Sequence, residues 1–141
     1  MLPKKKILII EDNALNRMFL RQILDDEYEV LEAENGEQGL QILREGKDDI
    51  MMVLLDVIMP VMDGYAFLDI VTKDEELSRV PVIVMTQRDS EADEVKALSH
   101  GATDFVPKPY RPQIILHRVA SLIKLRENAA MVNLFKFDSL T

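Results

Sequence analysis

The sequence predicts an α/β protein whose core is a doubly wound, five-stranded parallel sheet. Short apolar runs of strand length alternate along the chain with amphipathic helical segments, which is the order of repeated strand–helix units. Three of the apolar runs have no polar alternation, as expected of parallel strands that helices cover on both faces. The expected strands occupy residues 7–10, 28–33, 50–55, 80–85 and 104–106.

Helical patterns fill the intervals between these strands and follow the last one. Asn13, Asp63 and Ser90 stand where three of the helices begin and are suitable N-caps, because their side chains can accept a hydrogen bond from a free backbone N–H. The apolar residues at helical spacing are expected to face the sheet. They are Leu15, Met18, Phe19 and Ile23; Leu40, Ile42 and Leu43; Tyr65, Leu68 and Val71; Val95 and Leu98; and Ile115, Val119 and Leu122.

The fifth strand is expected at an edge of the sheet. Pro107 follows its apolar residues directly. Proline has no N–H to donate and is therefore tolerated mainly in edge strands.

Composition narrows the possible functions. The 141 residues are 48% hydrophobic and 30% charged, which is ordinary for one globular domain. A net charge of −8 argues against nucleic-acid binding by this domain and is compatible with cation binding. With no cysteine, disulfides, thiolate nucleophiles and zinc–sulfur sites are excluded. No run reaches the length of a signal-peptide core or a membrane span, so we expect a cytoplasmic protein that does not insert into a membrane.

Five reactive side chains follow the expected strands. Glu11 and Asp12 come after the first strand, Asp56 after the third, Thr86 after the fourth and Lys108 after the fifth. In an open parallel sheet these strand ends meet at one rim, where functional groups gather. We therefore expect three acids, one hydroxyl and one ammonium group to lie close together.

These groups fit a magnesium and phosphate site. Adjacent carboxylates such as Glu11 and Asp12 repel by roughly 4 kcal/mol at about 4 Å and an effective dielectric of about 20. A bound Mg²⁺, which prefers a few carboxylate and carbonyl oxygens, would neutralise them. No histidine or cysteine stands at the rim, which disfavours zinc and copper. Lys108 and Thr86 could then contact phosphoryl oxygens by charge and by hydrogen bonding.

Four segments resemble the signature segments of response-regulator receiver domains. They are "IIEDN", "LLDVIMPVMDG", "VIVMT" and "DFVPKPY", each at an expected strand end, and the resemblance covers roughly residues 5–125. It implies the CheY-like, flavodoxin-like (βα)5 fold with strand order 2-1-3-4-5. It also implies a domain that works in two-component signalling.

The resemblance implies a role for each residue of the rim. Asp56 would accept a phosphoryl group from a histidine kinase or phosphotransfer protein. Asp12 would bind Mg²⁺ directly and Glu11 mostly through water, with Asp56 and the backbone carbonyl of Ile58 as further ligands. Lys108 would pair with the phosphoryl group. Slow hydrolysis of the aspartyl phosphate would make "enzyme" a marginal description of this domain.

The same resemblance implies a conformational switch. Phosphorylation would draw in the Thr86 hydroxyl, and the ring of Phe105 would turn inward behind it. The Lys108–Pro109 peptide bond would be cis. Glu11 and Phe105 replace the more frequent aspartate and tyrosine of the family, and Gln87 stands where a small residue is common.

The C-terminal segment is expected to connect the receiver, residues 1–125, to an output domain. Leu122, Leu125, Ala129 and Val132 follow a 3-4-3 spacing, which fits a short coiled coil in a phosphorylation-dependent homodimer. An ordinary amphipathic helix end packed on its own domain fits equally well. Within residues 126–141, "DSLT" resembles the opening of a diguanylate cyclase (GGDEF) domain in the same polypeptide.

Three other functions are compatible with parts of this pattern. An Asp-nucleophile phosphatase usually has a second acid two residues after the nucleophile, where this chain has Ile58. A dinucleotide-binding fold would have G-x-G-x-x-G after the first strand, which is missing here. A stand-alone receiver, or a pseudo-receiver that docks partners without phosphorylation, is a further alternative. The intact residues Asp12, Asp56, Thr86 and Lys108 argue against a pseudo-receiver.

Overall fold

A five-stranded parallel sheet forms the centre of the computed structural model, which describes residues 3–57, 59, 61–86 and 90–140, with residues 130–140 described by their backbone. The strand order is β2-β1-β3-β4-β5, so the predicted fold class and strand order are confirmed and β5 lies at an edge. The strands are β1 (Lys5–Ile10), β2 (Tyr28–Ala33), β3 (Ile50–Asp56), β4 (Val82–Thr86) and β5 (Asp104–Pro107). The helices are α1 (Ala14–Leu24), α2 (Gly36–Gly46), α3 (Gly64–Lys73), the 3-10 turn η1 (Leu77–Arg79), α4 (Glu91–Ser99) and α5 (Pro112–Leu140).

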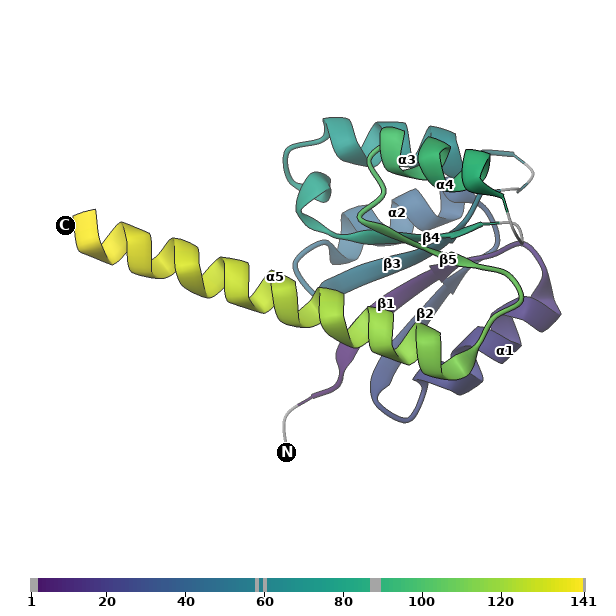
Figure 1. Ribbon diagram of the computed structural model, residues 1–141, viewed down its shortest axis with the longest axis horizontal. Coiled ribbons are helices and arrows are strands. Elements are labelled where there is room, and N and C mark those ends of the chain that lie inside the picture. Colours follow the sequence, from purple (N-terminus) through teal and green to yellow (C-terminus); the bar gives the residue numbers. More distant parts are fainter. Residues whose placement is uncertain (1–2, 58, 60, 87–89, 141) are drawn as a thin grey trace.

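Helices cover both faces of the sheet, with α1 and α5 on one side and α2, α3 and α4 on the other (Figure 1). Side chains of successive strand residues point to opposite faces. In β1, Ile7 and Ile9 pack with the apolar residues of α1 and α5, whereas Leu8 and Ile10 pack with those of α2 to α4. All four are fully buried. This two-sided burial explains why the central strands carry unbroken apolar runs.

Of the apolar residues predicted to face the sheet from α1, only Ile23 packs against the core, and the two predicted from α4 are exposed. Leu15 and Phe19 are 71% and 41% exposed, and the buried residues of α1 are Leu20 and Leu24. The buried face of α1 is therefore displaced by one residue toward the C-terminus from the predicted face, which is a rotation of about 100° around the helix axis. Helix α4 buries Ala97 and exposes Val95 and Leu98, because it packs over β4 and β5 at the edge of the sheet. The apolar faces predicted for α3 and α5 are confirmed by the burial of Leu68, Val71, Ile115, Val119 and Leu122.

Side-chain caps begin the helices at the rim where the strands end. The predicted caps are confirmed: Asn13 accepts from the Asn16 N–H at 3.0 Å, Asp63 from Ala66 at 2.9 Å and Ser90 from Asp93 at 3.2 Å. These bonds satisfy N–H groups that have no partner within the helix. They fix the point at which each loop leaves the rim and enters its helix. A fourth cap, Asn35 at the start of α2, was not predicted.

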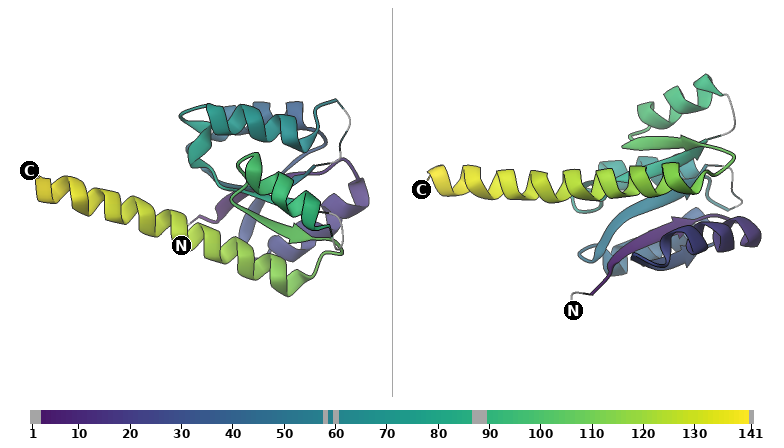
Figure 2. Two further views of the ribbon diagram at one scale, coloured as in Figure 1. Left: turned by 45° about the horizontal axis from the view of Figure 1, so that its top comes forward. Right: turned by 60° about the horizontal axis from the view of Figure 1, so that its bottom comes forward.

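Helix α5 continues well past the sheet and away from the other elements (Figures 1 and 2). Its last described contacts with the sheet come from Arg126 and Glu127. Arg126 Nη1 donates to the carbonyl oxygens of Ile50 and Met51 at 3.0 and 2.7 Å, and Glu127 pairs with Lys5. Residues 126 and 127 therefore still contact the sheet, just beyond the predicted receiver boundary at residue 125. Across the described part of the chain, none of the helices combines the length and the apolarity needed to cross a bilayer.

Candidate functional site

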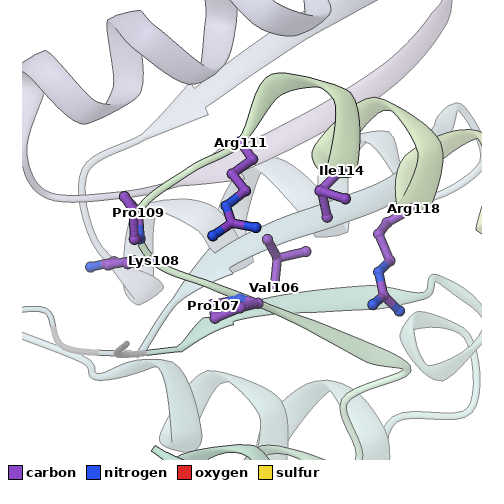
Figure 3. A pocket seen from close by; sticks show the side chains of 7 residues that line it. All are labelled: Val106, Pro107, Lys108, Pro109, Arg111, Ile114 and Arg118. Atoms are coloured by element: carbon purple, nitrogen blue, oxygen red, sulfur yellow. The ribbon is translucent and has the colours of Figure 1, made fainter. Parts of the chain in front are cut away.

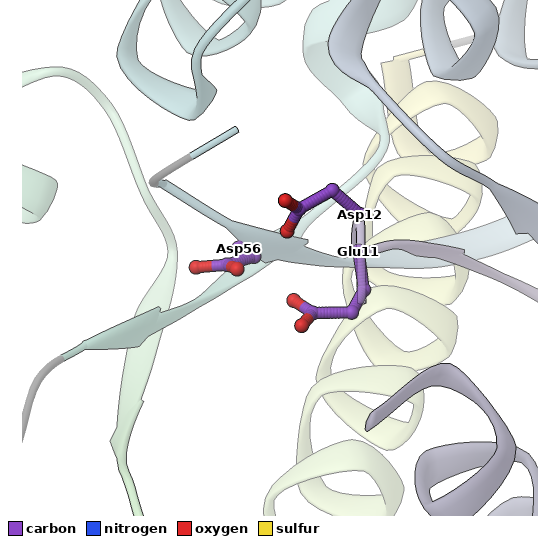
Figure 4. A group of neighbouring side chains, drawn as sticks. All are labelled: Glu11, Asp12 and Asp56. Carbon is purple, nitrogen blue, oxygen red and sulfur yellow. The ribbon is translucent and has the colours of Figure 1, made fainter. Parts of the chain in front are cut away.

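Three carboxylates meet at the rim of the sheet. Glu11 and Asp12 follow β1, and Asp56 ends β3. These strands are parallel neighbours with Ile10 paired to Leu55, so their carboxyl ends lie level. One carboxylate oxygen from each acid lies within 4.8 Å of the other two, and the three groups point into the same space (Figure 4). The sequence prediction that these acids converge is thus confirmed in geometry.

The acid cluster is largely shielded from water. Glu11 is 1% exposed and Asp56 is 3% exposed. Burial, together with the neighbouring Asp56, raises the pKa of Glu11 to about 8, although the Asn16 side chain and the charge of Lys108 act against this rise. The Asn16 amide donates to Glu11 Oε1 at 2.8 Å. Glu11 Oε2 is buried and has no hydrogen-bond partner among the described residues. Near neutral pH this carboxyl therefore carries a proton that a cation can displace.

Lys108 and Thr86 complete the rim on the β4–β5 side. Lys108 Nζ lies 3.4 Å from Asp56 Oδ1. The Lys108 N–H donates to the Thr86 carbonyl at 2.8 Å, which holds the end of β5 against the end of β4. The Lys108–Pro109 peptide bond is cis. The Thr86 hydroxyl is fully buried and has no hydrogen-bond partner among the described residues.

The order and placement of these residues match a known family. Residues 7–120 match the sequence model of the response regulator receiver domain. The chain belongs to this family. Receiver domains of this kind are parts of two-component signalling systems, and the five-stranded fold described above agrees with this membership.

Related receivers occur alone and within longer proteins. PilH of Pseudomonas aeruginosa is 34% identical over 119 residues, which cover 84% of this chain and 97% of PilH. The transcriptional regulatory protein CpxR of Klebsiella pneumoniae is 35% identical over 120 residues, which cover 84% of this chain and 49% of CpxR. The signal receiver domain of a histidine kinase from Syntrophus aciditrophicus superposes with a TM-score of 0.78 at 30% identity, covering 85% of this chain and 90% of that one. The chain thus spans nearly all of PilH but about half of CpxR.

The donor set of this receiver fits a hard divalent cation. It consists of carboxylate oxygens, and a raised pKa together with an unpartnered buried oxygen at Glu11 indicates that the group lacks its counter-charge. Asp12, in contrast, is exposed and can be reached from solvent. The expected carbonyl ligand, Ile58, and Gln87 lie outside the described residues. Phe105, the expected switch residue, is half-buried in β5 opposite Val84.

Glycine is required where the chain leaves Asp56. The Gly64 N–H donates to the Val57 carbonyl at 2.9 Å, which folds the start of α3 back onto the end of β3. A Cβ at Gly64 would lie 2.5 Å from Val57 Cα and 2.7 Å from the Asp56 carbonyl oxygen. Both are backbone atoms that cannot turn aside. The glycine of "MDG" therefore allows the close approach that places Asp56.

Tyr110 is a site residue that the sequence reasoning missed. Its ring stacks on Phe19 of α1 with centroids 6.3 Å apart, and Lys108 Nζ lies 6.0 Å from its centroid. Burial and the nearby Glu11, Asp56 and Asp12 raise the pKa of its phenol. The phenol thus stays neutral beside the acids. The available signal was an aromatic residue directly after Pro109 in "KPY".

A pocket of about 370 Å³ adjoins this site between β5 and the start of α5. Figure 3 shows Arg111 and Arg118 pointing toward the strand that carries Val106 and Pro107. Arg118 Nη1 lies 3.1 Å from Asp104 Oδ2. Lys108 lines the pocket and also contacts Asp56. The lysine therefore separates this basic pocket from the acid cluster.

Proposed function

We propose that this receiver accepts a phosphoryl group on Asp56 from the phosphohistidine of a histidine kinase or phosphotransfer protein, with Mg²⁺ as cofactor. The observation that carries the proposal is the meeting of Asp56 with two further acids within 4.8 Å and with Lys108 Nζ at 3.4 Å. Family membership supports it, because receiver domains pair with histidine kinases.

The acids Glu11, Asp12 and Asp56 would hold the metal ion. When bound, Mg²⁺ supplies positive charge that offsets the charge of the transferred group. Glu11 would lose its proton to solvent when the cation binds, because burial and the neighbouring Asp56, which raise its pKa, are then offset by the charge of the cation. Asp12 is exposed and can be reached from solvent.

Asp56 would act as the nucleophile. One carboxylate oxygen forms a bond to phosphorus while the bond between phosphorus and the histidine nitrogen breaks, and the histidine leaves with the electron pair and takes up a proton. Lys108 would then stabilise the negative oxygens of the aspartyl phosphate, because its ammonium group already lies 3.4 Å from Asp56 Oδ1. Slow hydrolysis of the aspartyl phosphate by water would restore the Asp56 carboxylate, so the phosphorylated state would have a limited lifetime.

Thr86 and Phe105 would convert phosphorylation into a conformational change. The Thr86 hydroxyl is buried and has no described partner, so a phosphoryl oxygen offers it a hydrogen bond that the unmodified protein lacks. Movement of Thr86 would free space for the half-buried ring of Phe105. The two-state element is expected to be the region of α4, β5 and α5, which these residues adjoin.

We also propose that α5 connects this receiver to an output domain in the same polypeptide. Helix α5 runs to Leu140 and leaves the sheet after Glu127, which suits a connecting helix. The segment "DSLT" supports a diguanylate cyclase, and pairing of two copies along α5 would make the output depend on phosphorylation. A receiver that acts without an output domain in the same polypeptide is the alternative.

Intact mass after incubation with acetyl phosphate tests the phosphoacceptor. We expect one added phosphate in the presence of Mg²⁺, none in EDTA and none in Asp56→Asn. Lys108→Ala should be labelled poorly while its Mg²⁺ affinity is retained. No label in the wild type, with Mg²⁺ binding intact, would point to a pseudo-receiver or to a site that only a kinase can phosphorylate, and absence of label from a phosphorylated histidine kinase as well would overturn the proposal.

A further inference from the structure

Arg17 lies beneath the loop that carries Glu11 and Asp12. It stands one turn into α1, and its side chain is 14% exposed. Its Nη1 donates to the Glu11 carbonyl at 2.9 Å and to the Asp12 carbonyl at 3.3 Å. One guanidinium nitrogen therefore holds two consecutive peptide groups, those of the two adjacent acids.

The same guanidinium is held from the other side by acids at the end of β2. Arg17 Nε lies 3.5 Å from Glu32 Oε1, and Nη2 lies 3.7 Å from Glu34 Oε1. The backbone N–H of Glu11 donates to the Ala33 carbonyl at 3.0 Å, so the loop is attached to this strand twice. Because a guanidinium is planar and its donors are fixed, these contacts determine where the two carbonyl oxygens lie.

We propose that Arg17 is a positioning residue for the cation site, and that it turns the Glu11 and Asp12 carboxylates toward Asp56 by fixing their peptide groups. This inference rests on the proposed function of that site. The charge of Arg17 cannot be its contribution, since a positive group near a cation site opposes cation binding. Its contribution is geometric, as with other residues that orient metal ligands without touching the metal.

Calorimetric titration with MgCl₂ separates these roles. Arg17→Lys keeps the charge and loses the planar fork, whereas Arg17→Met loses both. We expect each to weaken Mg²⁺ binding about tenfold or more, as loss of a residue that orients metal ligands typically does. Arg21→Lys is the matched control, because Arg21 also pairs with Glu32 from α1 but has no described contact with the carbonyls of Glu11 and Asp12. It should bind Mg²⁺ as the wild type does.

The outcomes distinguish this inference from the proposed function. Wild-type Mg²⁺ affinity in Arg17→Lys would mean that the planar guanidinium is not needed and would overturn the inference. Tighter binding by Arg17→Met would also overturn it, because the charge of Arg17 would then outweigh any effect on geometry. A fall in melting temperature in EDTA with unchanged Mg²⁺ affinity would also overturn it, because Arg17 would then serve only the fold. Glu32→Gln, which removes one charge that holds Arg17, should weaken Mg²⁺ binding even if Arg17→Met does not fold. Failure of the wild type to bind Mg²⁺ would instead overturn the proposed function itself.

Discussion

Thr86 carries a hydroxyl that is fully buried and has no described partner. Such a group costs about 1–3 kcal/mol, so its removal should stabilise the unphosphorylated protein. We expect Thr86→Val to raise the free energy of unfolding by about 1 kcal/mol in urea titrations. The same variant should lose the change in amide hydrogen exchange that we expect phosphorylation to cause in α4 and β5.

Thr86→Ser is the control for this prediction, because it keeps the hydroxyl and removes only a methyl group. It should retain the exchange response to phosphorylation. A Thr86→Val protein less stable than the wild type would contradict the prediction and would mean that the hydroxyl is satisfied in solution.

Val61 adopts a left-handed backbone conformation in the loop between β3 and α3. Its φ is 69°, and its side chain is 77% exposed. A left-handed conformation costs an L-residue about 1–2 kcal/mol and is especially poor for a β-branched one. We expect Val61→Asn to raise the free energy of unfolding by about 0.5–1 kcal/mol, since asparagine tolerates this conformation. Both changes can be measured by thermal denaturation. Val61→Ile, which keeps the β-branched side chain, should not raise the free energy of unfolding.

Between β3 and α3, the elements approach each other at Gly64. A methyl group there would meet the backbone of Asp56 and Val57. We expect Gly64→Ala to lower the free energy of unfolding by about 1–3 kcal/mol, the usual cost of overpacking, and to reduce labelling by acetyl phosphate in the molecules that stay folded. Gly46→Ala is the matched control, because its nearest contact is the end of the Ile50 side chain at 3.2 Å. Normal labelling of folded Gly64→Ala would show that this approach does not position Asp56.

At the level of elements, strands were easier to predict than the orientation of helices. Short apolar runs, three of them unbroken, located all five strands within two residues at each end. The caps Asn13, Asp63 and Ser90 were predictable because capping is local. Which side of α1 is buried depends on its packing with the sheet and α5. A face shifted by one residue was therefore enough to expose Leu15 and Phe19.

The acids of the site were predictable for a topological reason. The carboxyl ends of parallel strands meet at one rim of the sheet. Once the fold was predicted correctly, the acids Asp12 and Asp56 and the neighbouring Lys108 were therefore expected to converge. The contacts of Asn16, Arg17 and Tyr110 were not predictable, because they depend on how α1 and the β5–α5 connection turn toward the loop after β1.

The stability of the whole molecule should depend on pH through Glu11. Burial raises the pKa of Glu11 to about 8 in the folded protein, well above that of an exposed carboxyl in the unfolded chain. Between these two pKa values the folded state binds more protons, so the free energy of unfolding falls as pH rises. In EDTA we expect the free energy of unfolding to decrease by about 1 kcal/mol or less per pH unit between pH 5 and pH 8, measured by urea denaturation.

Two comparisons check the source of this pH dependence. Glu11→Gln should flatten it, whereas Glu37→Gln, which changes an exposed acid in α2, should leave it unchanged. Saturating Mg²⁺ should remove the trend, because the cation keeps the Glu11 carboxyl ionised in the folded protein, as it already is in the unfolded chain above about pH 5. An unchanged slope in Glu11→Gln would assign the dependence to another group.

The central claim for the molecule is that its three converging acids make Asp56 the phosphoacceptor. Its most direct test is to treat the protein with acetyl phosphate and Mg²⁺, reduce the acyl phosphate with borohydride and locate the resulting homoserine by peptide mass spectrometry. We predict homoserine at position 56 and unmodified aspartate at position 12. Homoserine at position 12 or at another acid, with Asp56 unmodified, would contradict the claim.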